Sequence, residues 1–144
     1  MPATTTRRFF SRETSVSVDI SATADRVWSL LTDVAGIPKW NSTVVTLSGE
    51  IKPGGRIALV STLDPKRTFK LAVKGFVPGR RLVWGDAMGT RTYEISPRPG
   101  AGVTVTMHEK IGGPVFPLFA RMIPPFDAAF DQFAADLKRA AEST

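Results

Sequence analysis

The chain has 144 residues and a formal net charge of +6, with 42% apolar and 22% charged residues. This length suits one domain that buries about 70% of the surface exposed by its unfolded chain, and the composition is that of ordinary globular proteins. There is no cysteine and a single histidine, His108. Disulfides, cysteine nucleophiles, iron–sulfur clusters and zinc sites built from cysteines or several histidines are therefore excluded.

No segment is typical of a signal peptide or of a membrane span. The first 14 residues are basic but lack an apolar core, and the longest apolar region, 114–126, is interrupted by Arg121 and four prolines. No P-loop or dinucleotide fingerprint is present. We therefore expect a cytoplasmic protein without a metal or other cofactor.

The basic residues form two groups. Arg7, Arg8 and Arg12 lie near the N-terminus, and a second group spans residues 66–74. They could meet an anionic partner such as membrane lipid, but an ordinary solvated surface explains them more simply. Because no basic motif with interleaved aromatic residues is present, we expect no nucleic-acid partner.

The first predicted elements are a strand and a helix. Residues 14–20 alternate strictly between apolar and polar side chains, as in a half-buried strand. Ser21 or Thr23 can cap the next helix, and Gly36 and Pro38 end it. One apolar stripe runs along this helix and consists of Val27, Leu30, Leu31 and Val34.

Six further strand candidates follow, at 43–51, 55–63, 67–77, 80–87, 90–96 and 102–111. Short turns rich in glycine and proline separate them, which implies antiparallel neighbours. The last third changes to helical spacing, with Pro125 in the first turn of the predicted helix and an apolar stripe made of Phe126, Ala129, Phe130, Phe133 and Leu137. We predict an α+β domain in which this long helix covers a six- to seven-stranded antiparallel sheet. The first 12 residues are expected to be flexible.

Strand alternation assigns the inner face of the sheet. If Pro78 and Gly79 form a two-residue turn, Val73 lies opposite Trp84, and Leu82, Trp84 and Asp86 point inward, although the turn beside Asp86 favours exposure. His108 points outward. The remaining inner set consists of Ile57, Leu59, Ser61, Phe69, Leu71, Arg91, Tyr93, Ile95, Val103, Val105, Met107 and Glu109.

Four stretches carry a resemblance to a known family. They are SATADRVWSLLTDVAGIPKWN (21–41), VPGRRLVWG (77–85), GVTVTMHEKIGG (102–113) and the C-terminal amphipathic helix. In their order and spacing they resemble the SRPBCC superfamily of START-related, helix-grip proteins, and more narrowly its polyketide cyclase/dehydrase-like branch. The resemblance implies one domain over 13–144, with a curved sheet wrapped around the C-terminal helix and one or two short helices after the first strand.

The resemblance also implies a cavity for an apolar ligand between sheet and helix, although dense packing could fill it instead. Trp40, after the first helix, would line or plug one end of it. The expected ligand-binding residues are Trp40, Leu59, Ser61, Phe69, Leu71, Val73, Trp84, Arg91, Tyr93, Val105, Met107, Glu109, Phe119, Met122, Ile123, Phe126 and Phe130.

Arg91, Tyr93 and Glu109 are the candidate catalytic residues. Arg91 could hold a ligand carboxylate or enolate, and Glu109 could act as a base. The simpler interpretation is a structural ion pair between Arg91 and Glu109, because an unpaired buried charge is very costly.

Three functions remain open. We favour a module that binds a small hydrophobic molecule, whether a lipid, a polyketide-like chain or an aromatic compound. The alternatives are a polyketide cyclase or dehydratase, and a stress-related or membrane-surface protein with weak affinity for anionic lipid. The expected oligomeric state is a monomer or a homodimer.

Overall fold

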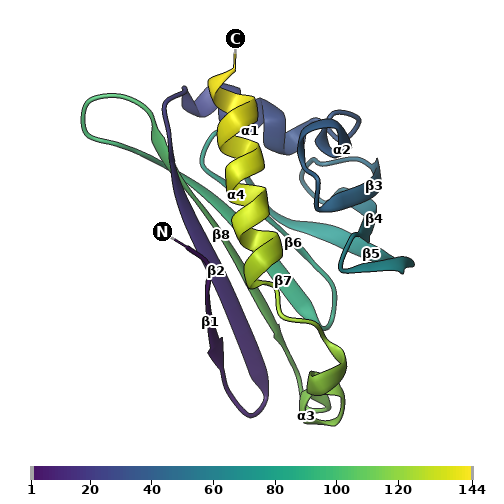
Figure 1. The fold of residues 1–144 in the computed structure, drawn as a ribbon. Helices are drawn as coiled ribbons and strands as arrows, with labels where there is room; N and C mark the ends of the chain where they lie inside the picture. Colours follow the sequence, from purple (N-terminus) through teal and green to yellow (C-terminus); the bar gives the residue numbers. More distant parts are fainter. Residues whose placement is uncertain (1, 144) are drawn as a thin grey trace.

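The computed structural model describes residues 2–143, within which an antiparallel sheet of eight strands bends around the long C-terminal helix (Figure 1). The strand order is β1-β2-β8-β7-β6-β5-β4-β3. The strands are β1 (Thr4–Arg7), β2 (Ser11–Ile20), β3 (Val44–Gly49), β4 (Arg56–Ser61), β5 (Asp64–Val77), β6 (Arg81–Gly85), β7 (Gly89–Pro97) and β8 (Val103–Gly112). The helices are α1 (Ala24–Thr32), α2 (Ile37–Trp40), α3 (Phe116–Phe119), the 3-10 helix η1 (Ala120–Met122) and α4 (Asp127–Glu142). The helix-grip architecture and the two short helices after the first long strand are confirmed.

The sheet has one strand more than the six to seven that the sequence predicts. The extra strand, β1, lies in the segment expected to be flexible and pairs with residues 12–15 of β2. Two contacts also tie this segment to α4: the Ala3 amide donates to Asp131 at 2.7 Å, and the Thr5 hydroxyl donates to Asp127 at 2.6 Å. Four residues give too short a pattern to predict a strand from alternation, and these contacts join residues far apart in the sequence.

The first helix, α1, begins after Thr23, which is one of the two residues predicted to cap it. The Thr23 hydroxyl accepts a hydrogen bond from the Arg26 amide at 3.1 Å, and Val27 and Leu31 are buried against the sheet. The chain leaves this helix after Thr32 and forms the single turn of α2, with Pro38 near its start.

The pairing of Val73 with Trp84 is confirmed, but the turn that produces it differs from the prediction. The β5–β6 turn has three residues, since Val77 pairs with Arg81. A bulge at Lys74 offsets the additional residue, so Trp84 still lies opposite Val73 on the inner face. Asp86 does not share that face, because its carboxylate accepts the Met88 and Gly89 amides, both at 2.9 Å, in the β6–β7 turn.

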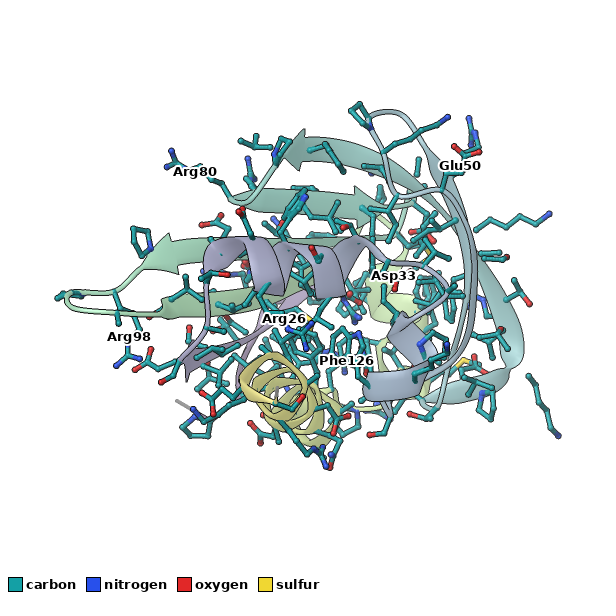
Figure 2. The ribbon with its side chains drawn as sticks, turned by 90° about the horizontal axis from the view of Figure 1, so that it is seen from above. Arg26, Asp33, Glu50, Arg80, Arg98 and Phe126 are labelled. Carbon is teal, nitrogen blue, oxygen red and sulfur yellow. The ribbon has the colours of Figure 1, made fainter. Side chains whose placement is uncertain are left out.

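Helix α4 packs its apolar stripe against the concave face of the sheet. Phe130, Phe133 and Leu137 are at most 2% exposed. Phe126 precedes the helix as its N-cap, so Pro125 lies before the first turn rather than in it. Seen along the helix, Phe126 lies between α4 and the sheet, whereas Arg80 and Glu50 project outward from the edge of the molecule (Figure 2).

A buried arginine fixes the segment that leads into α4. Arg12 is only 3% exposed, although the sequence suggested a surface charge. Its guanidinium donates to the carbonyl oxygens of Ile123 at 3.2 Å and Pro124 at 2.9 Å and lies over the Phe126 ring. Ile123 and Pro124 lie between η1 and α4, outside any helix or strand, and Arg12 satisfies their carbonyl groups.

A buried aspartate ties α4 to the loop after α2. Asp136 is 2% exposed and accepts hydrogen bonds from the Ser42 amide at 2.8 Å and the Ser42 hydroxyl at 2.7 Å. Gln132 and Arg139 donate to its other oxygen. Burial alone raises the pKa of Asp136, but these hydrogen bonds and the charge of Arg139 outweigh it and hold the pKa below the ordinary 3.8.

The contacts of Asp136 predict a loss of stability on substitution. Asp136→Asn should lower the free energy of unfolding by about 2 kcal/mol at neutral pH, because an amide cannot accept all four hydrogen bonds. Since the folded-state pKa is lowered, this contribution is present at neutral pH and is lost as the pH falls below about 5. Urea unfolding at a series of pH values measures both effects. The matched control is Asp25→Asn on the exposed side of α1, and equal stability of the two variants would contradict the assignment.

Candidate functional site

Three polar side chains meet in the otherwise apolar interior between the sheet and α4. The sheet register places Arg91 of β7 opposite Glu109 of β8, and the Arg91 Nε donates to the Glu109 carboxylate at 2.6 Å. Both side chains are less than a fifth exposed. Tyr93 is the next inward residue of β7 and is 4% exposed. The three candidate catalytic residues therefore form one cluster.

Aromatic rings surround this cluster. The Arg91 guanidinium lies 5.2 Å from the centre of the Phe130 ring of α4. Tyr93 contacts Trp84 at 5.2 Å and Phe133 at 5.7 Å between ring centres. A guanidinium over an aromatic face and paired with a carboxylate can remain charged in an apolar interior.

The surroundings shift the pKa of two of these groups. Burial by itself lowers the pKa of Arg91, but the charge of Glu109 and the neighbouring Tyr93 hydroxyl outweigh it and raise that pKa, so Arg91 stays cationic. Burial raises the pKa of Tyr93, Arg91 opposes that rise, and Glu109 adds to it. The interior thus holds a fixed positive charge beside a neutral phenol.

Two small hollows adjoin the cluster. The first, of about 10 Å³, is lined by Leu31, Ile37, Trp40, Asn41, Val44, Leu47, Leu59, Trp84, Arg91, Tyr93 and Phe133. The second, of about 20 Å³, is lined by Thr43, Ser61, Leu63, Arg91, Met107, Ala129, Phe130 and Phe133. Each has room for about one water molecule, whereas ligand pockets usually measure 300 Å³ or more. The space that the resemblance implies is therefore nearly filled in this structure.

Arg91 and Phe133 line both hollows. The sequence marked Phe133 as part of the helical stripe but gave no sign that it faces the site, because the pattern locates a helix face and not the space opposite it.

Trp40 is one of the residues that line the first hollow. Its ring lies 6.1 Å from the ring of Phe133, and its Nε1 is buried without a hydrogen-bond partner among the described residues. Asn41, directly after it, is 5% exposed and accepts two hydrogen bonds from Thr43. An indole N–H buried in this way is available to a water or to a ligand acceptor in the hollow.

The other predicted site residues fall into three groups. Leu59, Trp84, Arg91, Tyr93 and Trp40 line the first hollow, and Ser61, Arg91, Met107 and Phe130 line the second. Leu71, Val73, Val105, Phe119, Ile123 and Phe126 pack in or against the core without lining either hollow. Phe69 also lines neither hollow and lies under the Arg67 guanidinium. Met122 is 81% exposed, so its assignment to the site is wrong. It lies in η1, whose turn directs it away from the sheet.

His108 lies on the outer face, as the alternation of β8 predicts. Its Nε2 is 2.9 Å from the Glu13 carboxylate on β2, which places it on the opposite side of the sheet from Arg91. It therefore takes no part in the interior site.

The titration of Tyr93 tests the description of the interior directly, because it is the chain's only tyrosine. Phenolate absorbance of the native protein should rise at a pH above the ordinary 10.0, and in denaturant at about that value. Since the pKa of Tyr93 is raised in the folded state, the contribution of Tyr93 to the free energy of unfolding is complete below pH 10 and is lost above it.

Two arginine variants supply the control for this titration. Arg91→Met should move the phenolate titration to still higher pH, whereas Arg81→Met, on the exposed face of β6, should leave it unchanged. A native titration at or below the value in denaturant would contradict the buried position of Tyr93.

Comparison with known proteins identifies the family. The family model for polyketide cyclase/dehydrase and lipid transport matches residues 11–142. No curated protein matches the chain. Among solved structures, EF2215 of unknown function from Enterococcus faecalis has a TM-score of 0.72 at 13% identity, covering 98% of this chain and 77% of its own.

Two further structures share the fold. The di-domain aromatase/cyclase BexL from the BE-7585A biosynthetic pathway has a TM-score of 0.69 at 14% identity, covering 96% of this chain and 52% of its own. A START superfamily protein from Mycobacterium smegmatis has a TM-score of 0.66 at 15% identity, covering 90% of this chain and 97% of its own. Identities this low establish the fold alone. The family match shows that this chain belongs to the polyketide cyclase/dehydrase and lipid transport family, which is the branch that the sequence resembles.

Proposed function

We propose that the protein binds a small hydrophobic molecule carrying an acidic or enolic group, in the interior between the sheet and α4. The observation that carries this proposal is the position of Arg91, a buried cation that lines both hollows within apolar walls. Apolar surroundings favour the body of such a ligand, and a few fixed polar groups orient it. Family membership supports the same class of ligand.

Arg91 can accept an additional acidic partner without losing Glu109. A guanidinium has five N–H donors, and the bond to Glu109 uses Nε. The other nitrogens are the donors that we assign to a ligand carboxylate or enolate, and the free Trp40 Nε1 is a second donor at the first hollow. A charge-assisted hydrogen bond is roughly twice as strong as a neutral one.

Binding requires the interior to open, because the two hollows are small. The side formed by α2, β3 and β4 is the place we assign to this opening. This side is joined to α4 by the hydrogen bonds from Ser42 to Asp136 and by the contact between Trp40 and Phe133. Displacement of Trp40 and rotation of Phe133 would merge the hollows around Arg91. Opening costs free energy, so only a fraction of the molecules is open at any time. The observed affinity is the affinity of the open form multiplied by that fraction.

A matched pair of ligands tests the proposal. Titration calorimetry with 1-naphthoate and 1-naphthalenemethanol compares the same apolar body with and without an acidic group. We expect naphthoate to bind about tenfold more tightly, because the charge-assisted bond to Arg91 adds about 1.4 kcal/mol. In the neutral double variant Arg91→Met/Glu109→Gln, the two ligands should bind alike.

The control is an exposed ion pair on neighbouring strands. Arg81 and Glu94 pair across β6 and β7 with both side chains more than half exposed, and Arg81→Met/Glu94→Gln should keep the preference for naphthoate. If wild type binds neither compound, or if the preference survives the loss of Arg91, the proposal is wrong.

A cyclase or dehydratase is the second candidate function. The grouping of Arg91, Tyr93 and Glu109 favours it, because enolisation of a poly-β-keto chain needs a base and a donor to the developing enolate. The bond from Arg91 already occupies one oxygen of Glu109, which makes binding the simpler role. With a poly-β-keto substrate, activity that persists in Glu109→Gln, Tyr93→Phe and Arg91→Ala alike would exclude these residues as catalytic.

A further inference from the structure

One end of the molecule exposes a group of large apolar side chains. Phe9 and Phe10, in the β1–β2 turn, are 73% and 54% exposed, and Val115, Leu118 and Met122, around α3 and η1, are 53%, 84% and 81% exposed. We call these five residues the apolar tip. Single exposed apolar residues are common on proteins, but a group of this size requires an explanation.

The two segments of the apolar tip are neighbours in space. The Gly113 amide donates to the Phe10 carbonyl at 3.1 Å, and a side chain at Gly112 would clash with that same carbonyl. Figure 1 shows the β1–β2 turn and α3 together at the end of the molecule opposite the C-terminus. The tip is therefore one surface made from both ends of the sequence.

The charge on the two segments that carry the apolar tip has one sign. Segments 7–10 and 113–123 contain Arg7, Arg8 and Arg121 and no acidic residue, and all three arginines are exposed. Of the nearest carboxylates, Glu13 interacts with Arg8 and His108 on the outer face of the sheet, and Asp127 accepts a hydrogen bond from Thr5. The tip thus combines apolar side chains with a positive rim.

The backbone that carries the tip is held in place. Arg12 binds the carbonyl oxygens of Ile123 and Pro124, and Phe116 of α3 is buried at 4% exposure. The exposed side chains therefore do not reach the core by a local rotation. A surface fixed in this way loses little conformational freedom when it binds.

We propose that the apolar tip docks on an anionic lipid bilayer. Phenylalanine, leucine and methionine enter the boundary between headgroups and acyl chains, and arginines pair with lipid phosphates. The exposed arginines match a negatively charged surface, which a neutral protein partner would not provide. The inference does not depend on the interior ligand site. If both proposals hold, docking would bring the α3–α4 side of that site next to a bilayer.

Flotation with phosphatidylcholine vesicles, with and without phosphatidylglycerol, tests the proposal on the whole chain. Wild type should bind only the anionic vesicles, and less as the ionic strength rises from about 0.1 M to about 1 M, where the Debye length falls from about 10 Å to about 3 Å. Arg7→Gln/Arg8→Gln should weaken binding about fivefold for each arginine removed. Phe9→Ser/Leu118→Ser should weaken it at least as much.

The β5–β6 turn supplies matched controls. Arg80→Gln/Arg81→Gln removes the same charge, and Val77→Ser removes an apolar side chain that is 49% exposed. Both should bind as wild type does, and circular dichroism verifies that every variant is folded. No flotation, binding that ignores lipid charge, or equal losses in control and tip variants would overturn the proposal. Pairing of the tip with a second copy of the chain would also overturn it. That result would appear as a dimer that only the tip variants lose, while their flotation stays unchanged.

Discussion

The ion pair between Arg91 and Glu109 is the interaction around which the interior is arranged. Register between β7 and β8 sets the two residues opposite each other, and alternation turns both toward α4. A carboxylate or guanidinium alone in that apolar space would be very costly, so each requires the other. Such a pair adds little net stability compared with apolar side chains of the same size. The position of Arg91 beside two hollows is the feature on which the proposed ligand site depends.

Two buried polar side chains help to hold α4 in place, one of them bonding just before the helix and the other within it. Arg12 fixes the carbonyl groups that precede the helix, and Asp136 ties its middle to Ser42. Between these contacts the packing is aromatic, from Phe126 stacked on Phe130 to Phe133 against Trp40 and Tyr93. The helix is thus anchored by hydrogen bonds at defined points, with aromatic contacts around Arg91.

The sequence predicts those parts of the fold that depend on short-range patterns. Alternation placed Tyr93, Met107 and Glu109 on the inner face and His108 on the outer face, because side chains along a strand change sides at every residue. Periodicity and turn signals gave the order of strands and helices, and alternation on adjacent strands brought Arg91 and Glu109 together. The resemblance added the curved sheet wrapped around the C-terminal helix. Even the pairing of Val73 with Trp84 followed, although a three-residue turn and a bulge produce it.

Contacts between distant segments could not be predicted in this way. Arg12 is an isolated arginine in a basic stretch, and only the fold shows that it meets Pro124. Asp136 borders the apolar stripe of its helix, three residues after Phe133, which was the one available sign of its burial. Met122 was misassigned because the apolar run 114–126 contains the 3-10 helix η1, on which Met122 is exposed. The volume left between sheet and helix depends on all of these contacts together.

The central claim is that a ligand enters beside Arg91 between α4 and the sheet. Fluorine NMR of protein labelled with 5-fluorotryptophan tests it most directly, because the chain has three tryptophans. Trp40 and Trp84 line the first hollow, whereas Trp28 packs on Phe76 and lines neither hollow. On saturation with 1-naphthoate, the account predicts that the Trp40 and Trp84 resonances shift and that Trp28 stays in place. Saturable binding that moves Trp28 alone, or none of the three, would contradict it.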